Sequence, residues 1–201
     1  MAVASQTPYA YRPSFLESVV EDLLAGEGQD ARHAATLPPA TYTSQEFFNL
    51  EMAAVYKKDW VYLVHIAELD PDGGYFCVDL LGDKLAVLRK GTDVTVLNRV
   101  CSVSGKEVVS GAGKVEGGVL SAGGDAPVYD LSGAVLESRG YSDVAPLKSL
   151  RTEVWQGMIY ITYNKHVDSI IERLADLNPR VKNYDMPNLK VLFTEHFEQN
   201  F

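Results

Sequence analysis

The sequence has few of the residues that build redox or metal centres, with only Cys77, Cys101 and four histidines in 201 residues. Two cysteines allow at most one disulfide, and in a reducing compartment we expect both as thiols. Basic residues are also scarce, since 18 Lys and Arg face 27 Asp and Glu, which gives a net charge of -9. This balance disfavours nucleic acid as a partner.

Long apolar runs are missing as well. No stretch approaches the roughly 18 uninterrupted apolar residues of a membrane span, so we expect no membrane association. Residues 1–9 lack the basic and then apolar segments of a secretory signal, and we therefore expect a cytoplasmic location. The hydrophobic share of 46% is nevertheless sufficient for the core of one ordinary domain.

Two amphipathic helices are expected near the start of the chain. The first covers residues 15–24, where Phe15, Val19 and Leu23 recur at helical spacing. Two prolines at 38 and 39 separate it from a second helix over residues 44–57, for which Thr43-Ser44-Gln45-Glu46 supplies an N-cap. Its wide apolar face should dock on a sheet.

Beyond Trp60 the pattern changes to short β-rich runs, separated by turn residues about every ten positions. The predicted strands are residues 61–66, 75–80, 85–88, 94–100, 115–120, 128–131, 150–154 and 158–163. A helix over 165–177 and a final strand over 189–198 follow. The fold class is therefore mainly β, an antiparallel barrel or sandwich with N-terminal helices and one helix near the C-terminus.

This pattern divides the chain into three parts. Residues 1–36 form an N-terminal arm with a short helix, residues 37–180 form the β domain, and residues 181–201 form a C-terminal strand segment. Eight of the sixteen glycines lie between Gly105 and Gly133, which indicates loops with unusual backbone angles or close contacts.

The glycine-rich loops match neither a phosphate-binding motif nor a dinucleotide-binding motif. A phosphate-binding loop ending at Lys114 would need a glycine where Val108 stands and a hydroxyl where Val115 stands, and a dinucleotide fingerprint would need a glycine at Glu116. Cys101 has no histidine near it in sequence that could activate it as a nucleophile. A single cysteine at the end of a strand is typically a small core residue.

The histidines do not form a recognisable metal site. His33, His65, His166 and His196 show no i, i+4 pair, and His65 alternates with apolar neighbours as a core histidine does. A terminal strand with alternating polar residues explains the positions of Glu195, His196 and Glu198 better than a metal site does.

The order of several segments resembles the N-terminal half of Rieske non-haem iron (aromatic-ring-hydroxylating) oxygenase alpha subunits. The resemblance extends over roughly residues 37–165. It is carried by residues 37–43, the segment from Phe47 through Trp60, residues 73–79 and 94–101, Tyr129-Asp130-Leu131-Ser132-Gly133 and Val154-Trp155-Gln156-Gly157.

The resemblance implies a [2Fe-2S] cluster held by two thiolates on one iron and two imidazoles on the other. The family places these ligands as Cys-x-His on one loop and Cys-x-x-His on a second. The flanking residues put Cys101 and Val103 on the first loop, and Ala122 and Asp125 on the second. Three of the four ligands are thus replaced, and we expect no cluster, no other cofactor and no catalytic or metal-binding residue.

The family's alpha subunits continue into a catalytic domain with a mononuclear iron, and we expect this chain to end about where that domain would begin. The leading hypothesis is a non-catalytic structural or regulatory subunit that assembles with a protein partner, either an oxygenase catalytic subunit or a second copy of the chain. One alternative is the detached front half of an oxygenase whose catalytic iron subunit is encoded separately. Another is a module that binds a small molecule or ion in the vacated cluster pocket.

Overall fold

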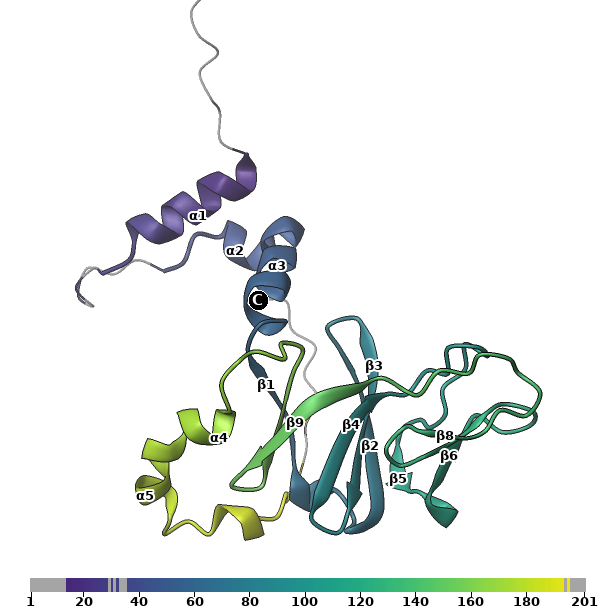
Figure 1. Cartoon of the computed structure of the whole chain (residues 1–201). Coiled ribbons are helices and arrows are strands. Elements are labelled where there is room, and N and C mark those ends of the chain that lie inside the picture. Colours follow the sequence, from purple (N-terminus) through teal and green to yellow (C-terminus); the bar gives the residue numbers. More distant parts are fainter. Residues whose placement is uncertain (1–13, 29, 31, 33–35, 194, 196–201) are drawn as a thin grey trace, which may run out of the picture. The chain divides into compact units, whose positions relative to one another are not determined.

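The computed structural model describes residues 14–28, 30, 32, 36–193 and 195. These residues form two compact units, one within residues 14–54 and one within residues 55–195 (Figure 1). The domain boundaries at residues 36 and 180 stay predictions. The expectations for residues 1–13, His33 and His196 lie outside the described residues.

The first unit is helical, as predicted. Helix α1 covers Phe15–Ala25, and its first turn is closed by a capping box. In this box the Ser14 hydroxyl accepts a hydrogen bond from the Glu17 N–H at 3.3 Å, and the Glu17 carboxylate accepts one from the Ser14 N–H at 2.6 Å. Such reciprocal bonds satisfy backbone donors that a helix start otherwise leaves unpaired. The predicted helix over 15–24 is confirmed.

The second predicted helix also forms, with a change of pitch inside it. After the short helix α2, Ala40–Thr43, helix α3 covers Gln45–Glu51, and η1, Met52–Tyr56, continues it as a wider π-helical turn. The predicted N-cap is present in the segment 43–46, where the Ser44 hydroxyl accepts a hydrogen bond from the Phe47 N–H at 3.2 Å. None of the helices in the described part of the chain is long and apolar enough to cross a membrane.

The second unit is built from antiparallel sheets, which confirms the predicted fold class. A seven-stranded sheet has the order β1-β10-β9-β4-β3-β2-β5, and a three-stranded sheet has the order β6-β7-β8. The strands of the large sheet are β1 Trp60–His65, β2 Asp72–Leu80, β3 Asp83–Lys90, β4 Asp93–Asn98, β5 Ala112–Lys114, β9 Ser149–Trp155 and β10 Met158–Thr162. Those of the small sheet are β6 Val119–Ser121, β7 Val128–Asp130 and β8 Val135–Glu137.

Strand β3 lies between two hydrophobic cores. Leu85 and Val87 point into a core with Ile159 and Ile161, whereas Ala86 and Leu88 belong to a second core. This second core contains Leu97, Cys101, Val108, Leu120, Tyr129 and Leu147. Because successive side chains of a strand point to opposite faces, an uninterrupted apolar run serves both cores. The small sheet packs against the large one through the second core.

The predicted strand over 115–120 is wrong. Strand β5 ends at Lys114, a 3-10 turn covers Glu116–Gly118, and β6 begins at Val119. Gly117 and Gly118 have φ values of 67° and 69°, which strand geometry does not allow. Strands β5 and β8, which have three residues each, are not predicted from the sequence.

The helix predicted over 165–177 begins later and is broken. Helix α4 covers Ile170–Arg173, the 3-10 turn η4 covers Ala175–Leu177, and α5 covers Asn178–Val181. Tertiary hydrogen bonds hold the residues before it out of the helix. The Trp60 indole N–H donates to the Asp168 carbonyl at 2.8 Å, and Arg151 donates to the Val167 carbonyl.

The final predicted strand is wrong over the part of it that the structure describes. Residues 189–193 pair with no strand and follow the 3-10 turn η5, Met186–Asn188. An apolar, β-prone sequence becomes a strand only where a neighbouring strand accepts and donates its backbone hydrogen bonds. No described strand pairs with this segment, although β1 and β5 are edges of the large sheet.

Candidate functional site

Cys101, the residue expected to keep a cluster-ligand type, lies in a tight loop after β4. Its side chain is fully buried in the second core. The Cys101 N–H donates to the Lys106 carbonyl at 2.9 Å, and the Cys101 carbonyl accepts from the Gly105 N–H at 2.8 Å. The Tyr129 hydroxyl, from β7, donates to Cys101 Sγ at 3.1 Å. The sulfur is therefore a hydrogen-bonded member of the core.

The hydrogen bonds around Cys101 lower the pKa of its thiol. Burial by itself raises the pKa of the Cys101 thiol, but hydrogen bonds from Ser104, Tyr129 and the Val103 backbone together bring that pKa below its usual value. Burial and the neighbouring sulfur raise the pKa of Tyr129 well above its usual range, which keeps its hydroxyl a donor. Cys77 differs, because burial raises the pKa of its thiol.

The other three expected positions carry no sulfur or imidazole. Val103 packs against the core that contains Cys101, Ala122 is half-buried, and Asp125 is exposed. The turn that carries Ala122 and Asp125 joins β6 to β7 and is held by one hydrogen bond within it and one from Arg139, which follows β8. The Gly123 carbonyl accepts from the Ala126 N–H, and the Gly124 carbonyl accepts from Arg139 at 2.7 Å. Tyr129 connects this hairpin to the Cys101 loop.

These four positions supply one thiol and one carboxylate. A Rieske cluster requires two thiolates and two imidazoles, so the donor set present does not fit that group. Among the described residues, no group of three or more His, Cys, Asp or Glu side chains lies close enough together to hold a metal ion. The chemistry available at Cys101 is that of a buried, hydrogen-bonded thiol.

His65 is hydrogen-bonded, as the sequence predicts, but it is half-buried and lies outside both cores, so the expected core position is wrong. Its Nδ1 accepts a hydrogen bond from the Ala67 N–H at 3.2 Å, so the ring proton is on Nε2, which lies 3.1 Å from the Met186 carbonyl. A Cβ on Gly157 would lie 2.3 Å from the same Nε2. His166 is exposed on a loop, so the two described histidines lie in unrelated surroundings.

Arg99 positions the Cys101 loop, a role that its sequence context does not reveal. Its buried guanidinium donates to the Val78 and Leu85 carbonyls at 3.1 and 3.0 Å. It also forms ion pairs with Asp79 at 2.6 Å and with Glu107 at 3.1 Å. One side chain thus joins β2, β3 and both ends of the Cys101 loop.

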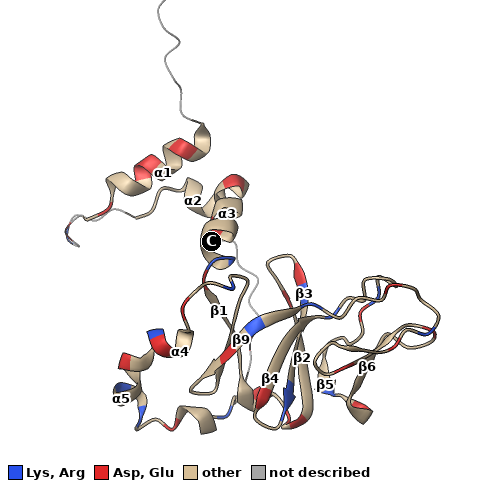
Figure 2. Cartoon of the chain, viewed as in Figure 1, with Lys and Arg blue, Asp and Glu red and all other residues tan. Residues whose placement is uncertain are grey.

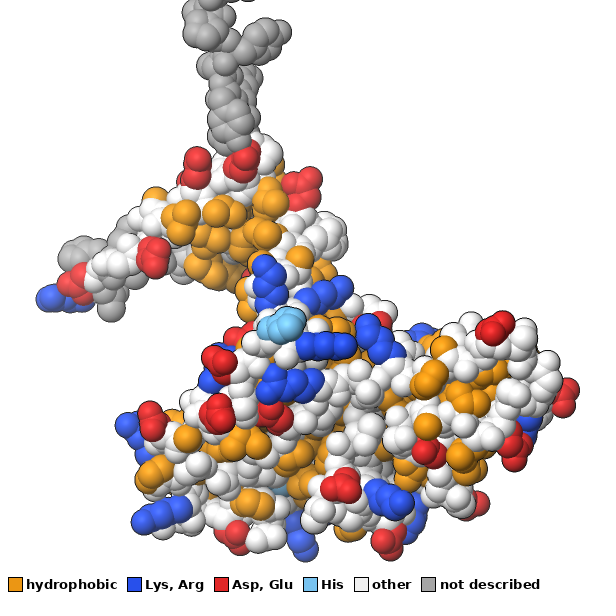
Figure 3. All heavy atoms as spheres, viewed as in Figure 1, with side chains coloured by type: hydrophobic (Ala, Val, Ile, Leu, Met, Phe, Trp, Pro, Cys, Tyr) orange, Lys and Arg blue, Asp and Glu red, His pale blue; other side chains and the backbone are white. Residues whose placement is uncertain are grey.

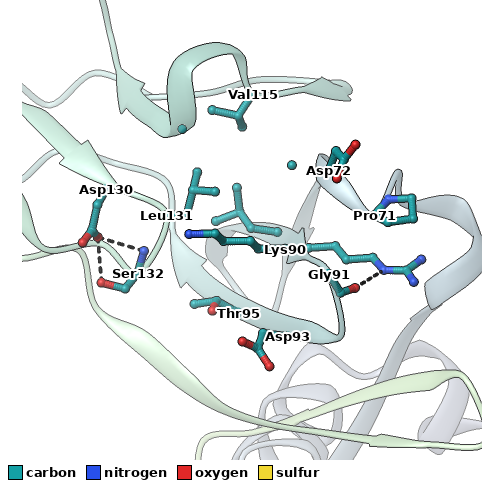
Figure 4. A pocket seen from close by; sticks show the side chains of 14 residues that line it. Pro71, Asp72, Lys90, Gly91, Asp93, Thr95, Val115, Asp130, Leu131 and Ser132 are labelled. Atoms are coloured by element: carbon teal, nitrogen blue, oxygen red, sulfur yellow. Dashed lines mark hydrogen bonds between the residues drawn. The ribbon is translucent and has the colours of Figure 1, made fainter.

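A cavity of about 500 Å³ opens in the same unit, at the turn between β3 and β4. Lys90 extends across it, Asp93 and Thr95 line one side, and Val115 and Leu131 lie opposite (Figure 4). Cys101 follows the other end of β4, and residues 122–125 lie at the other end of β7. The cavity is therefore distinct from the four expected ligand positions.

The glycine-rich segment is explained by backbone conformation, as the sequence predicts. All of its eight glycines except Gly113 have positive φ. Gly113 has ordinary φ but contacts the ring of Tyr75, where a Cβ would lie 3.4 Å away. These residues shape the turns on either side of β5 and β6, and they form no phosphate-binding motif.

Comparison with known proteins relates the chain to oxygenases, although no protein-family model matches it. The carnitine monooxygenase oxygenase subunit of Acinetobacter pittii is 24% identical over 176 residues, which cover 84% of this chain and 46% of that protein. The corresponding Escherichia coli K12 subunit is 27% identical over 75% of this chain and 42% of its own length. Benzene 1,2-dioxygenase subunit alpha of Pseudomonas putida is 25% identical over 80% of this chain and 36% of its own length.

Solved structures show the same fold. A quaternary ammonium Rieske monooxygenase in complex with an inhibitor aligns with a TM-score of 0.69 at 22% identity, covering 78% of this chain and 46% of that one. Naphthalene 1,2-dioxygenase from Rhodococcus sp. aligns with a TM-score of 0.67 at 19% identity, covering 83% and 39%.

The chain is therefore homologous to the alpha subunits of Rieske oxygenases and shares their fold over the aligned part. It spans less than half the length of the curated relatives that it matches. Those relatives are named as oxygenase subunits.

Proposed function

We propose that this chain is a cluster-less Rieske-type protein that acts as a non-catalytic structural or regulatory subunit of an oxygenase assembly. The observation that carries the proposal is the environment of the Cys101 sulfur. Its sulfur is buried in an apolar core and bonded to the Tyr129 hydroxyl. A cysteine in this position stabilises the domain as a core residue does.

The chemistry of the remaining positions supports the same conclusion. Val103 has no lone pair to donate, Ala122 has no atom beyond Cβ, and the Asp125 carboxylate is a hard oxygen donor where an imidazole is required. Function resides in the site rather than in the fold, so kinship with oxygenases does not by itself supply an activity. A role through a protein partner is consistent with relatives that are themselves subunits.

Metal and sulfide analysis of the purified full chain tests the proposal directly. We expect no stoichiometric iron or acid-labile sulfide, and neither the visible absorption nor the EPR signal of a Rieske cluster. Iron and sulfide at two atoms each per chain, lost on Cys101→Ala, would overturn the proposal.

A gain-of-ligand variant tests whether the two loops still correspond to those of the family. The triple substitution Val103→His, Ala122→Cys and Asp125→His restores the full donor set beside Cys101. We expect this variant to take up iron and sulfide on reconstitution and to become brown. The same triple substitution with Cys101→Ala is the matched control and should stay colourless. A folded but colourless triple variant would contradict the assignment of these positions.

A further inference from the structure

The cavity at the β3–β4 turn has the size of a small-molecule site. Its volume of about 500 Å³ lies within the range of about 300–1,000 Å³ that ligand pockets usually have. All of its lining residues lie between Pro71 and Ser132, within the second unit. None of them belongs to the Cys101 site, so the cavity is a separate candidate for ligand binding.

One wall of the cavity is apolar and is held by the second core. Leu88 is only 2% exposed and is a member of that core. Val115, after β5, and Leu131, after β7, pack against the same core and line the cavity. We call these three side chains the apolar wall. Because core packing fixes them, the wall is preformed in the way that ligand sites usually are.

Most charged groups around the cavity are already engaged by the fold. The Arg89 guanidinium donates to three backbone carbonyls, each at 3.0 Å. Asp130 accepts hydrogen bonds from the Ser132 hydroxyl at 2.6 Å and from nearby backbone N–H groups. The Asp72 carboxylate lies 3.8 Å from Lys114 Nζ. These groups shape the rim and have little capacity left for a ligand.

Two charged groups of opposite sign stay unpaired. Lys90 ends β3 and Asp93 begins β4, and they stand opposite each other in the hairpin register. Within the part of the chain that the structure describes, neither side chain forms an ion pair. Figure 4 shows the reason, since Lys90 extends across the cavity towards Leu131 while Asp93 stays beside Thr95. An ammonium and a carboxylate are thus both available to one occupant.

A ligand with a single charge does not match this lining. The charged residues around the cavity are Arg89, Lys90, Asp72, Asp93 and Asp130. An anion would face three carboxylates, and a cation would face two basic groups. Figures 2 and 3 show the same mixture, with acidic and basic residues close together along the lower edge of the sheet, below β4 and β2. The complementary ligand carries both charges.

We propose that this cavity binds a free α-amino acid with a large apolar side chain. The carboxylate of the ligand pairs with the Lys90 ammonium, its ammonium pairs with the Asp93 carboxylate, and its side chain lies on the apolar wall. The Cβ atoms of an opposed cross-strand pair are about 5 Å apart, so both charges can contact the two ends of one small zwitterion. Charge-assisted hydrogen bonds fix its orientation, and apolar burial adds affinity.

Isothermal titration calorimetry of the full chain with L-phenylalanine tests the proposal. We expect saturable binding of one molecule per chain. L-Phenylalaninamide lacks the carboxylate and 3-phenylpropanoate lacks the ammonium, so each should bind about tenfold more weakly. Glycine carries both charges but has no side chain for the apolar wall, and it should show no saturable binding at the same concentrations.

Two substitutions assign each charge to its partner. Lys90→Met should weaken L-phenylalanine about tenfold without weakening L-phenylalaninamide, because that analogue has no carboxylate to lose a partner. Asp93→Asn should weaken L-phenylalanine to a similar extent without weakening 3-phenylpropanoate. The matched controls Lys106→Met and Asp143→Asn remove the same groups from exposed positions elsewhere, and they should bind as the wild type does.

Several results would overturn the proposal. They are the absence of saturable heat from L-phenylalanine with the wild-type chain, equal affinity for the amino acid and its two analogues, and equal affinity in the two cavity variants and their controls. The analogue series uses the unmodified protein, so this test does not depend on the folding of any variant. The site is independent of the proposed function, on which iron and sulfide analysis reports separately.

Discussion

At the scale of single residues, the hydrogen bond from Tyr129 and the burial of Cys101 determine the environment of the sulfur in the candidate site. The sulfur is fully buried, and its hydrogen bond comes from a strand of the other sheet. Buried polar groups destabilise a protein when they lose their partners, so the hydrogen bond contributes to stability and also lowers the pKa of the thiol. The two residues thus link the two expected ligand loops.

Removal of the Tyr129 hydroxyl tests this link. Tyr129→Phe should lower the free energy of unfolding by about 1 kcal/mol, because Cys101 Sγ loses a donor while the ring is kept. The pKa of the Cys101 thiol should rise for the same reason, as measured by the thiolate absorbance in a Cys77→Ala background. Tyr62→Phe is the control, since Tyr62 is 49% exposed. Equal losses in urea denaturation would show that the bond contributes nothing.

At the scale of elements, the β9–β10 hairpin fixes the position of His65. Its two-residue turn has Gln156 at φ 51° and Gly157 at φ 83°, the left-handed pair that a tight hairpin requires. The turn backbone also accepts the Ile66 N–H at 2.7 Å. Gly157 is needed both for its backbone angle and for its close contact with the imidazole.

A pair of glycine substitutions separates these two requirements. Gly157→Ala should destabilise the protein more than Gly82→Ala, although both positions have similar positive φ. The reason is space, since a Cβ at Gly82 meets nothing within 4 Å and one at Gly157 meets His65 Nε2 at 2.3 Å. We expect about 1 kcal/mol of backbone strain for Gly82→Ala and about 2–4 kcal/mol in total for Gly157→Ala. Thermal or urea unfolding measures both, and equal effects would exclude the clash.

At the scale of the whole molecule, ion pairs and hydrogen bonds lower the pKa of several carboxyl groups. The ammonium of Lys84 and the guanidinium of Arg99 lower the pKa of Glu107, and Arg173 lowers that of Asp59. Hydrogen bonds from the Ser132 hydroxyl and nearby backbone N–H groups lower the pKa of Asp130. In each case the folded protein binds the proton less tightly than the unfolded chain does.

This difference predicts loss of stability in acid. A carboxyl group with a lowered folded-state pKa stabilises the protein fully above its unfolded value, which is 4.5 for Glu107 and 3.8 for Asp59. The contribution disappears as the pH falls through the folded-state pKa. The urea concentration at which half of the protein is unfolded should therefore decrease as the pH is lowered from about 5 to about 3. Glu107→Gln should make this fall shallower, whereas Glu116→Gln, at an exposed position, should leave it unchanged. A midpoint that is flat across this range would refute the prediction.

Local sequence signals predicted the elements that depend on neighbouring residues. Ser44 caps its helix, the apolar run of β3 becomes a strand, and the glycine-rich segment adopts left-handed angles. The failures have non-local causes. Residues 165–169 stay out of a helix because Trp60 and Arg151 bind their carbonyls, and residues 189–193 find no strand to pair with.

The candidate site shows the same division. The sequence alone determined which atoms stand at the four expected ligand positions, since side-chain chemistry is fixed by residue identity. Only the tertiary structure decided that Cys101 is buried, that Tyr129 bonds to it and that Arg99 fixes its loop. These contacts join the loop after β4 to strands β2, β3 and β7, and their partners are selected by how the sheets pack and not by spacing along the chain.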